Sequence, residues 1–326
     1  MKWEILRTLR EREDYVSGQQ LCQGLGVSRT AVWKAIEELR TEGYVIDAVR
    51  NKGYCLVKAA DAITPAELKT ELHTKWLGRE IQYFDVTDST NTQAKRLAEA
   101  GAPHGTLAVA DRQTAGKGRR GRQWESPSGT GAWFSMVLRP EMNPANACML
   151  TLIAGMAVAA GIKEAVGLEA GIKWPNDLVI GGKKICGILT EMSTEAQDIR
   201  YVVTGIGINV NTVDFPKDIQ NTATSLLRES GKAVRRSCII GAVAKAFEHY
   251  YERFMETCDM SALRREYDEM LVNRDRQVTV LDPRGSYEGT ALGIDEGGNL
   301  LVCRTDGSVI SVISGEVSVR GIYGYV

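Results

Sequence analysis

Residues 116–122 read Gly-Lys-Gly-Arg-Arg-Gly-Arg and combine three glycines with four cationic side chains. The run matches the G-x-G-x-x-G pattern of dinucleotide-binding loops, whose glycines bring the backbone close to a pyrophosphate at the start of a helix. Residues 122–131, however, read RQWESPSGTG, a run of turn-forming residues that does not favour the required helix. We therefore interpret residues 116–122 as a mobile cationic loop for an anionic ligand, and not as a Rossmann loop.

Further charged side chains fall at a predicted turn and in a predicted strand. Lys173 and Asp177 lie at the two ends of a Lys-Trp-Pro-Asn-Asp turn. Alternation along a strand predicted at 183–189 places Lys184 on the same face as Cys186. A lysine among buried positions needs an anionic partner, which is either a carboxylate of the protein or a ligand.

Neutral polar residues gather at the ends of other predicted strands. Residues 88–92, DSTNT, follow a strand predicted at 81–85, and they either cap the next helix or form the polar end of a pocket. A strand predicted at 107–110 brings Gln113 to the mouth of the cationic loop. In residues 205–211, GIGINVN, glycines within a strand permit the close approach of a flat group, and asparagine amides could bind the edge of a base.

Residues 1–62 have the pattern of a winged helix-turn-helix domain. Ser17 and Gln20 form a capping-box pair at the start of a second helix, and Ser28 caps a third helix. Residues 50–53, RNKG, form the basic tip of the hairpin that follows. We predict that outward-facing residues of the third helix and of this tip contact DNA, namely Arg29, Thr30, Trp33, Lys34, Arg50 and Lys52. The alternative is a three-helix unit that binds another protein.

Composition places the chain among globular proteins. Its 326 residues suffice for two or three domains, and 40 Lys and Arg against 41 Asp and Glu give no global basic field that would attract nucleic acid or membranes. The seven cysteines form no C-x-x-C pair and the three histidines have no ligand spacing, which argues against disulfides and a metal site. No apolar run approaches about 20 residues, and the N-terminus lacks a signal sequence. We expect a cytoplasmic protein that does not enter a membrane.

The rest of the pattern predicts an α/β (α+β) chain in three units. The centre alternates predicted strands with helices, including a strongly apolar core helix over 149–166. From residue 277, short strands separated by turns about every eight to twelve residues predict a small β-barrel. We therefore expect a winged helix-turn-helix at 1–62, a central domain at 66–272 and a C-terminal β domain at 273–326.

Six motifs, in this order, resemble those of biotin-protein ligases. They are Ser-Thr-Asn at 89–91, Gln113, the loop at 116–122, Lys-Trp-Pro-Asn-Asp at 173–177, Lys-Lys-x-x-Gly-Ile at 183–188 and Gly-Ile-Gly-Ile-Asn at 205–209. With the winged helix in front, the chain resembles the bifunctional ligases that also repress the biotin operon. One position departs from the family, whose loop usually reads Gly-Arg-Gly-Arg. Lys117 keeps the charge but loses the bidentate guanidinium fork, which implies a weaker grip or a backbone contact in its place.

The resemblance implies a fold and a reaction. The fold has a central mixed-sheet ligase domain of the class II synthetase-like type and a C-terminal SH3-like β-barrel. The reaction joins biotin and ATP, with Mg²⁺, into biotinyl-5′-adenylate and pyrophosphate, and then transfers biotin to a lysine of a biotin carboxyl carrier protein. The resemblance also implies biotin-dependent repression at operator DNA by a homodimer that forms when the adenylate binds.

The resemblance further implies roles for individual residues. Lys184 and Arg119 are the implied catalytic cations, which offset the negative charge around the reacting phosphate. The implied biotin-binding residues are Ser89, Thr90, Asn91, Gln113, Lys117, Gly118, Arg119 and Lys184. Those implied for ATP and the adenylate are Arg119, Arg122, Trp124, Lys173, Asp177, Asn209 and Arg320. No protein ligand to a metal is implied.

Two alternatives stand beside this interpretation. One is a ligand-sensing repressor without ligase activity, and the other is a relative of lipoate-protein ligases. The presence of Lys184 and of the complete cationic loop argues against a site that has lost catalysis. The pairing of the 173–177 motif with the Gly-Lys-Gly-Arg run favours biotin over lipoate.

Overall fold

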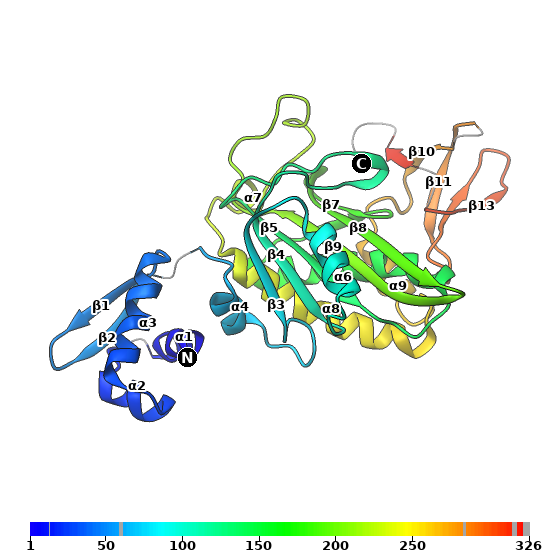
Figure 1. The fold of residues 1–326 in the computed structure, drawn as a ribbon. Coiled ribbons are helices and arrows are strands. Elements are labelled where there is room, and N and C mark those ends of the chain that lie inside the picture. Colours follow the sequence, from blue (N-terminus) through cyan, green and yellow to red (C-terminus); the bar gives the residue numbers. More distant parts are fainter. Residues whose placement is uncertain (13, 59–60, 283–284, 315–317, 322–326) are drawn as a thin grey trace.

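The computed structural model describes residues 1–326 except residues 13, 59–60, 283–284, 315–317 and 322–326, and the side chains of residues 58 and 318–321 also lie outside the described part. Arg320, a residue implied in nucleotide binding, is therefore described only as strand backbone. The described chain forms three β-sheets with helices packed on them, which confirms the α/β (α+β) prediction (Figure 1).

The N-terminal region consists of three helices and a hairpin. Its elements are α1 (Lys2–Glu11), α2 (Gly18–Leu25), α3 (Arg29–Thr41), β1 (Val45–Val49) and β2 (Gly53–Lys58). The predicted capping box is present, because the Ser17 hydroxyl accepts from the backbone N–H of Gln20 and the Gln20 side chain accepts from that of Ser17. Gly26 ends α2 with a left-handed φ of 65°, and Ser28 caps α3. The predicted helix-turn-helix and its wing are confirmed.

The centre of the molecule is a seven-stranded sheet in the order β3-β4-β5-β9-β8-β7-β6. Its strands are β3 (Ile81–Thr87), β4 (Thr106–Gln113), β5 (Gly131–Leu138), β6 (Gly171–Lys173), β7 (Asp177–Ile180), β8 (Lys183–Glu195) and β9 (Asp198–Asn209). Strands β3 and β4 run parallel, and the other neighbouring pairs run antiparallel. The mixed sheet implied by the family resemblance is therefore confirmed.

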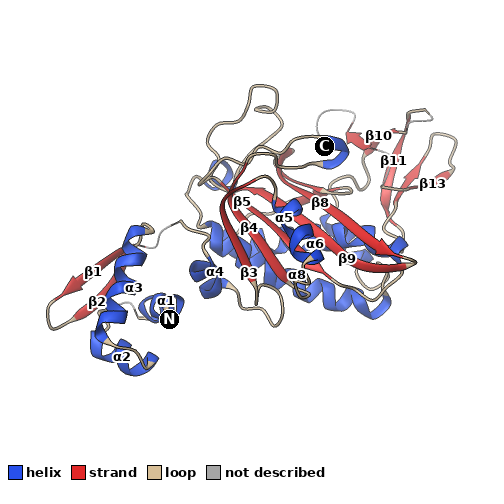
Figure 2. Ribbon diagram, in the orientation of Figure 1, coloured by secondary structure: helices blue, strands red, loops and turns tan. Residues whose placement is uncertain are grey.

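Helices cover both faces of this sheet (Figure 2). The helices of this part of the chain are α4 (Pro65–Glu71), α5 (Thr90–Glu99), α6 (Leu150–Val166), α7 (Leu226–Ser230), α8 (Arg236–Thr257) and α9 (Arg264–Met270), and it also contains the 3-10 turns η1 (Arg119–Gly121) and η2 (Pro144–Met149). Leu107 and Met136 point toward α6 and α8, whereas Ala108 and Val137 point toward α5. Strand alternation thus separates the two cores.

Helix α6 is the apolar core helix predicted over 149–166, and its inner positions are fully buried. By length and composition alone, the described stretch Pro144–Val166 could cross a membrane. However, 72% of its most apolar window is buried inside the structure, as is usual for the core helix of a globular domain.

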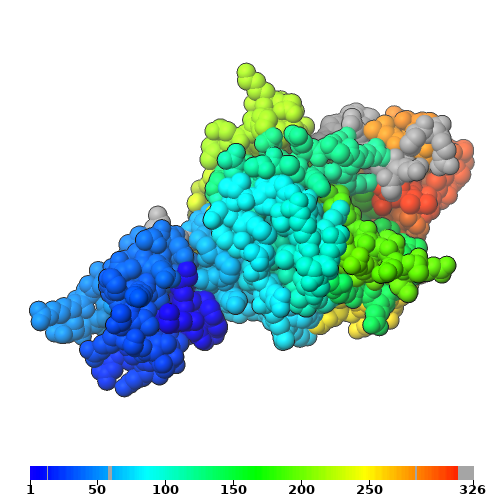
Figure 3. Space-filling model, viewed as in Figure 1, coloured from blue at the N-terminus to red at the C-terminus, as the bar shows by residue number. Residues whose placement is uncertain are grey.

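The C-terminal region is an antiparallel sheet of five strands in the order β13-β12-β11-β10-β14. Its strands are β10 (Gln277–Leu281), β11 (Tyr287–Ile294), β12 (Leu300–Cys303), β13 (Val309–Val312) and β14 (Ser318–Gly321). Val278, Ala291 and Leu300 join the hydrophobic core of the central sheet. In Figure 3 this region and the N-terminal lobe lie at opposite ends of the molecule.

Candidate functional site

One end of the candidate site is built by the parallel pairing of β3 with β4. The register places Thr87 opposite Gln113, so the polar turn after β3 meets the last residue of β4. The backbone N–H of Thr90 donates to Gln113 Oε1 at 2.8 Å, and Gln113 Nε2 donates to Ser126 Oγ at 2.7 Å. Ser89 occupies the N-cap position of α5, but its side chain makes no capping hydrogen bond. The hydroxyl and amide groups here therefore form a pocket end.

The cationic loop is a short hairpin and not the start of a helix, which confirms that residues 116–122 are no Rossmann loop. Gly118 N–H donates to the carbonyl of Arg122 at 2.7 Å, and Lys117 pairs with Gln123. Arg119 reaches across the site, where its Nη1 donates to Asn176 Oδ1 at 2.8 Å and its Nη2 donates to the carbonyl of Ser314. The loop thus spans from the polar end of the pocket to the C-terminal region.

Lys184 lies at the cationic end, opposite Asp177. Its Nζ is 2.6 Å from Asp177 Oδ1 and lies 5.1 Å from the centre of the Trp124 ring. The prediction that Lys184 shares a strand face with Cys186 is wrong, because a bulge shifts the pairing of β8 with β7 at this point. Lys184 lies instead beside Gly187, where a Cβ atom would be 3.3 Å from its Nζ.

The glycines of β8 and β9 make room for the flat side chain of Trp124. A Cβ atom on Gly207 would lie 2.6 Å from Trp124 Nε1, and one on Gly187 would lie 3.0 Å from the same indole ring. The Trp124 indole therefore rests against both strands. Its Nε1 is buried and has no hydrogen-bond partner among the residues that the structure describes.

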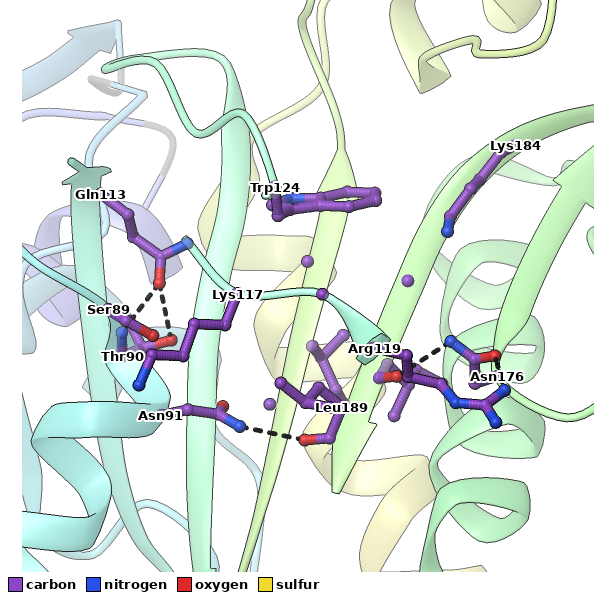
Figure 4. A pocket seen from close by; sticks show the side chains of 16 residues that line it. Ser89, Thr90, Asn91, Gln113, Lys117, Arg119, Trp124, Asn176, Lys184 and Leu189 are labelled. Carbon is purple, nitrogen blue, oxygen red and sulfur yellow. Dashed lines mark hydrogen bonds between the residues drawn. The ribbon is translucent and has the colours of Figure 1, made fainter. Parts of the chain in front are cut away.

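Together these groups line a single elongated pocket (Figure 4). Figure 4 shows Ser89, Thr90 and Gln113 at one end, Arg119 and Lys184 at the other, and Trp124 between them. The predicted residues that line it are Ser89, Thr90, Asn91, Gln113, Lys117, Gly118, Arg119, Trp124 and Lys184. Arg119 also lines an adjoining cavity of about 280 Å³ between α6, β8 and the loops of the C-terminal sheet.

Other predicted residues lie outside the lining of this pocket in the described part of the chain. Lys173 is buried at the end of β6, and Asp177 contacts the site through Lys184. Asn209 is buried, with its Nδ2 donating to the carbonyl of Thr224 at 3.1 Å. The Arg122 side chain is exposed on the loop.

Sequence reasoning missed two residues that hold the site together. Asn176, within the 173–177 turn, anchors Arg119. Ser135 of β5 is fully buried and hydrogen-bonds to the polar turn after β3. A polar residue in the otherwise apolar run 132–138 was the available signal, because a buried hydroxyl needs a partner.

The predicted DNA-contacting residues are exposed on α3 and on the hairpin tip of the N-terminal region. Arg29, Thr30 and Lys34 are exposed on α3, and the Trp33 side chain is 54% exposed. Arg50 and Lys52 are exposed at the hairpin tip. The opposite face of α3 is buried in the core of the N-terminal region, so the α3 side chains in this set face outward.

No group of three or more His, Cys, Asp and Glu side chains within the described ranges could hold a metal ion. All seven cysteines carry free thiols.

Three parts of the chain match models of known domain families. Residues 83–209 match the biotin/lipoate A/B protein ligase family, residues 3–55 match a helix-turn-helix domain, and residues 275–320 match the biotin protein ligase C-terminal domain.

Whole-chain relatives agree with these matches. The bifunctional ligase/repressor BirA of Bacillus subtilis is 43% identical over 296 residues, covering 90% of this chain and 91% of that protein. Its Escherichia coli counterpart is 31% identical over 309 residues, covering 94% of each chain. The structure of biotin protein ligase from Aquifex aeolicus in complex with biotin and ATP has 31% identity and a TM-score of 0.65, covering 74% of this chain and 99% of that one. The chain therefore belongs to the biotin protein ligase family, in its bifunctional ligase/repressor form.

Proposed function

We propose that the protein is an ATP-dependent biotin-protein ligase and a biotin-dependent repressor. It forms biotinyl-5′-adenylate and then transfers biotin to a lysine of a biotin carboxyl carrier protein. The observation that carries this function is the pocket with a neutral polar end and a cationic end. Such a pocket suits a substrate with a hydrogen-bonding ring at one end and a carboxylate at the other.

Biotin binds with its ureido ring at Ser89, Thr90, Asn91 and Gln113. Its chain and carboxylate then lie under the loop, near Lys117, Gly118 and Arg119. The loop glycines let the loop close over the adenylate, which is a mixed anhydride that water would destroy. Lys117 takes the position of the family arginine, and its ammonium supplies charge without a guanidinium fork.

Lys184 and Arg119 stabilise the charge that develops when the biotin carboxylate attacks the α-phosphate and pyrophosphate leaves. Burial lowers the pKa of Arg119, an effect that Asp177 opposes and that Arg120 and Arg122 reinforce. Asp177 holds Lys184 until the phosphate arrives. The adenylate further involves Arg122, Trp124, Lys173, Asn209 and Arg320. Mg²⁺, as a hard cation that prefers oxygen ligands, would supply further positive charge at the phosphates of ATP.

Transfer of biotin releases AMP. The ε-amine of the carrier lysine attacks the acyl carbon, an amide bond forms, and the bond from the acyl carbon to the phosphate oxygen breaks. The amine must lose a proton, and AMP leaves as an anion that the same cations stabilise.

Repression uses the N-terminal lobe. Residues of α3 read the major groove and the hairpin tip contacts phosphate. The adenylate-bound protein forms a homodimer, so that two winged helices meet a palindromic operator.

We assign DNA binding to residues 1–62 and ligation to residues 66–272 and 273–326. The protein acts in the cytoplasm, without a membrane.

Lipoate is a poorer fit than biotin. The polar end holds hydroxyl groups that are 2–4% exposed, those of Ser89 and Thr90. A dithiolane ring has no N–H or C=O for these groups, and a buried polar group without a partner costs free energy. A repressor without ligase activity would not need both Lys184 and Arg119 to stabilise charge at a reacting phosphate.

Pyrophosphate exchange tests the proposal. Labelled pyrophosphate should enter ATP when biotin is present, and a carrier domain should become biotinylated. Lipoate in place of biotin should support neither reaction. If biotin promotes no exchange, the ligase function is wrong, and if a gel shift with operator DNA ignores biotin and ATP, the repressor function is wrong.

A further inference from the structure

A chain of hydrogen bonds runs behind the polar end of the pocket, from Glu191 to Thr90. Asn91 Nδ2 donates to the carbonyl of Leu189 at 3.1 Å and to Glu191 Oε2 at 2.9 Å. A backbone carbonyl and an ionised carboxylate can only accept, so the nitrogen of the Asn91 amide must face them. The orientation of this amide is therefore determined, and its oxygen faces Ser135.

The orientation of the Asn91 amide in turn determines which hydrogen bond Ser135 donates. Its Oγ lies 2.7 Å from Asn91 Oδ1 and 2.8 Å from Thr90 Oγ1, and the residue is fully buried. A hydroxyl has one proton, and the amide oxygen can only accept it. The Ser135 proton is thus committed to Asn91, and Ser135 Oγ can only accept from Thr90.

Gln113 closes the network from the other side. The backbone N–H of Thr90 donates to Gln113 Oε1 at 2.8 Å, which identifies that atom as the oxygen. Thr90 Oγ1 lies 3.2 Å from the same oxygen. Both atoms within reach of the Thr90 hydroxyl proton, Ser135 Oγ and Gln113 Oε1, are therefore acceptors.

We propose that Glu191, acting through Asn91 and Ser135, is a positioning residue that makes Thr90 Oγ1 a hydrogen-bond acceptor toward the pocket. The site then selects a substrate ring that offers an N–H at this point. This inference rests on the proposed function and assigns the ring selectivity of that function to residues behind the pocket.

The far end of the network is anchored by charge. Lys95 of α5 forms an ion pair with Glu191, and the two side chains are 33% and 27% exposed. Burial would raise the pKa of Glu191, but hydrogen bonds from Lys95 and Asn91 outweigh it and hold the pKa below its ordinary value. Glu191 therefore stays ionised and acts only as an acceptor at neutral pH.

The absence of a side chain at Gly205 provides the space that this network occupies. A Cβ atom on Gly205 of β9 would lie 1.8 Å from Asn91 Oδ1 and 3.1 Å from Ser135 Oγ. The φ of Gly205 is not left-handed, so the glycine provides room and not backbone freedom.

The test compares biotin with the two cyclic carbamates in which one ring N–H or the other is replaced by oxygen. Affinities are measured by calorimetry for the full-length wild type, Ser135→Ala, Glu191→Gln and the matched control Glu195→Gln on the same strand. Wild type should bind one carbamate at least about tenfold more weakly than biotin, which is the size of one hydrogen bond. The ratio to follow is the Kd for this carbamate divided by the Kd for biotin. Ser135→Ala and Glu191→Gln should reduce this ratio about three- to tenfold, and Glu195→Gln should keep the wild-type ratio.

The KM for ATP should not change in these variants, which separates positioning from general damage to the fold. A ratio that stays at the wild-type value in both Ser135→Ala and Glu191→Gln overturns the inference while leaving the proposed function intact. Wild-type protein that fails to bind biotin overturns both. Should Ser135→Ala unfold, Glu191→Gln decides alone, because it preserves side-chain size.

Discussion

Lys184 tests the proposed chemistry at the scale of one residue. We predict that Lys184→Gln lowers biotin-dependent pyrophosphate exchange about 100- to 1000-fold, because one preorganised charge at a reacting phosphate contributes that much. The affinity for biotin should change far less. Lys183→Gln is the matched control, since Lys183 is the exposed neighbour of Lys184 on β8. This variant should catalyse pyrophosphate exchange at the wild-type rate. Equal rates for the two variants would remove Lys184 from the catalytic set.

Arg119 should control release of the intermediate. It ties the loop to Asn176 and to the carbonyl of Ser314, so Arg119→Gly frees the loop at both contacts. We predict that this variant releases biotinyl-5′-adenylate and biotinylates proteins indiscriminately, which a filtration assay for bound adenylate would detect. The control is Arg120→Gly, whose φ of 58° a glycine adopts readily. Full retention of adenylate by Arg119→Gly would contradict the prediction.

At the scale of elements, the close contact between α5 and β9 depends on Gly205. We predict that Gly205→Ala weakens biotin binding and lowers the free energy of unfolding by about 1–3 kcal/mol, because the added methyl forces the Asn91 amide out of its hydrogen bonds. Binding and urea unfolding should be measured on the same samples. Gly24→Ala is the control, since its added methyl in α2 would meet no atom within 4 Å apart from its chain neighbours and the nearby backbone of its own helix. It should be neutral or slightly stabilising, as alanine favours helices.

Features set by residues close together in the sequence were predicted correctly, whereas features set by residues distant in the sequence were not. The Ser17–Gln20 capping box and the Arg50–Gly53 turn involve residues three apart, and both were predicted correctly. The strand face on which Lys184 lies was predicted wrongly, because it is set by a bulge that depends on how β7 pairs with β8. The predicted boundary between the first two units, at residues 62–66, coincides with the start of α4, which begins at Pro65. The chain just before this helix is held by Arg236, 175 positions away, whose backbone N–H donates to Asp61.

At the scale of the whole molecule, buried charge joins the N-terminal lobe to the ligase core. Glu67 of α4 is fully buried and forms ion pairs with Arg10 of α1 and with Arg235, which precedes α8. The hydroxyl of Tyr44 also donates to Glu67, and burial together with this carboxylate raises the pKa of Tyr44 well above its ordinary value. Glu67 is therefore a desolvated charge at the junction, which makes the junction sensitive to the loss of one of its cationic partners.

Arg10→Ala should loosen this junction without touching the pocket. Removing one partner leaves Glu67 and Glu71 with Arg235 alone among these arginines, and breaking a buried pair in this way costs about 3–5 kcal/mol. We predict a larger radius of gyration by X-ray scattering, wild-type pyrophosphate exchange and weaker operator binding, because two mobile lobes no longer match fixed half-sites. Arg7→Ala is the control, as Arg7 forms a surface pair with Glu11 on the same helix. If scattering and operator binding of Arg10→Ala equal those of Arg7→Ala, the junction does not position the lobe, and the spacing of the two DNA-binding helices must be set elsewhere.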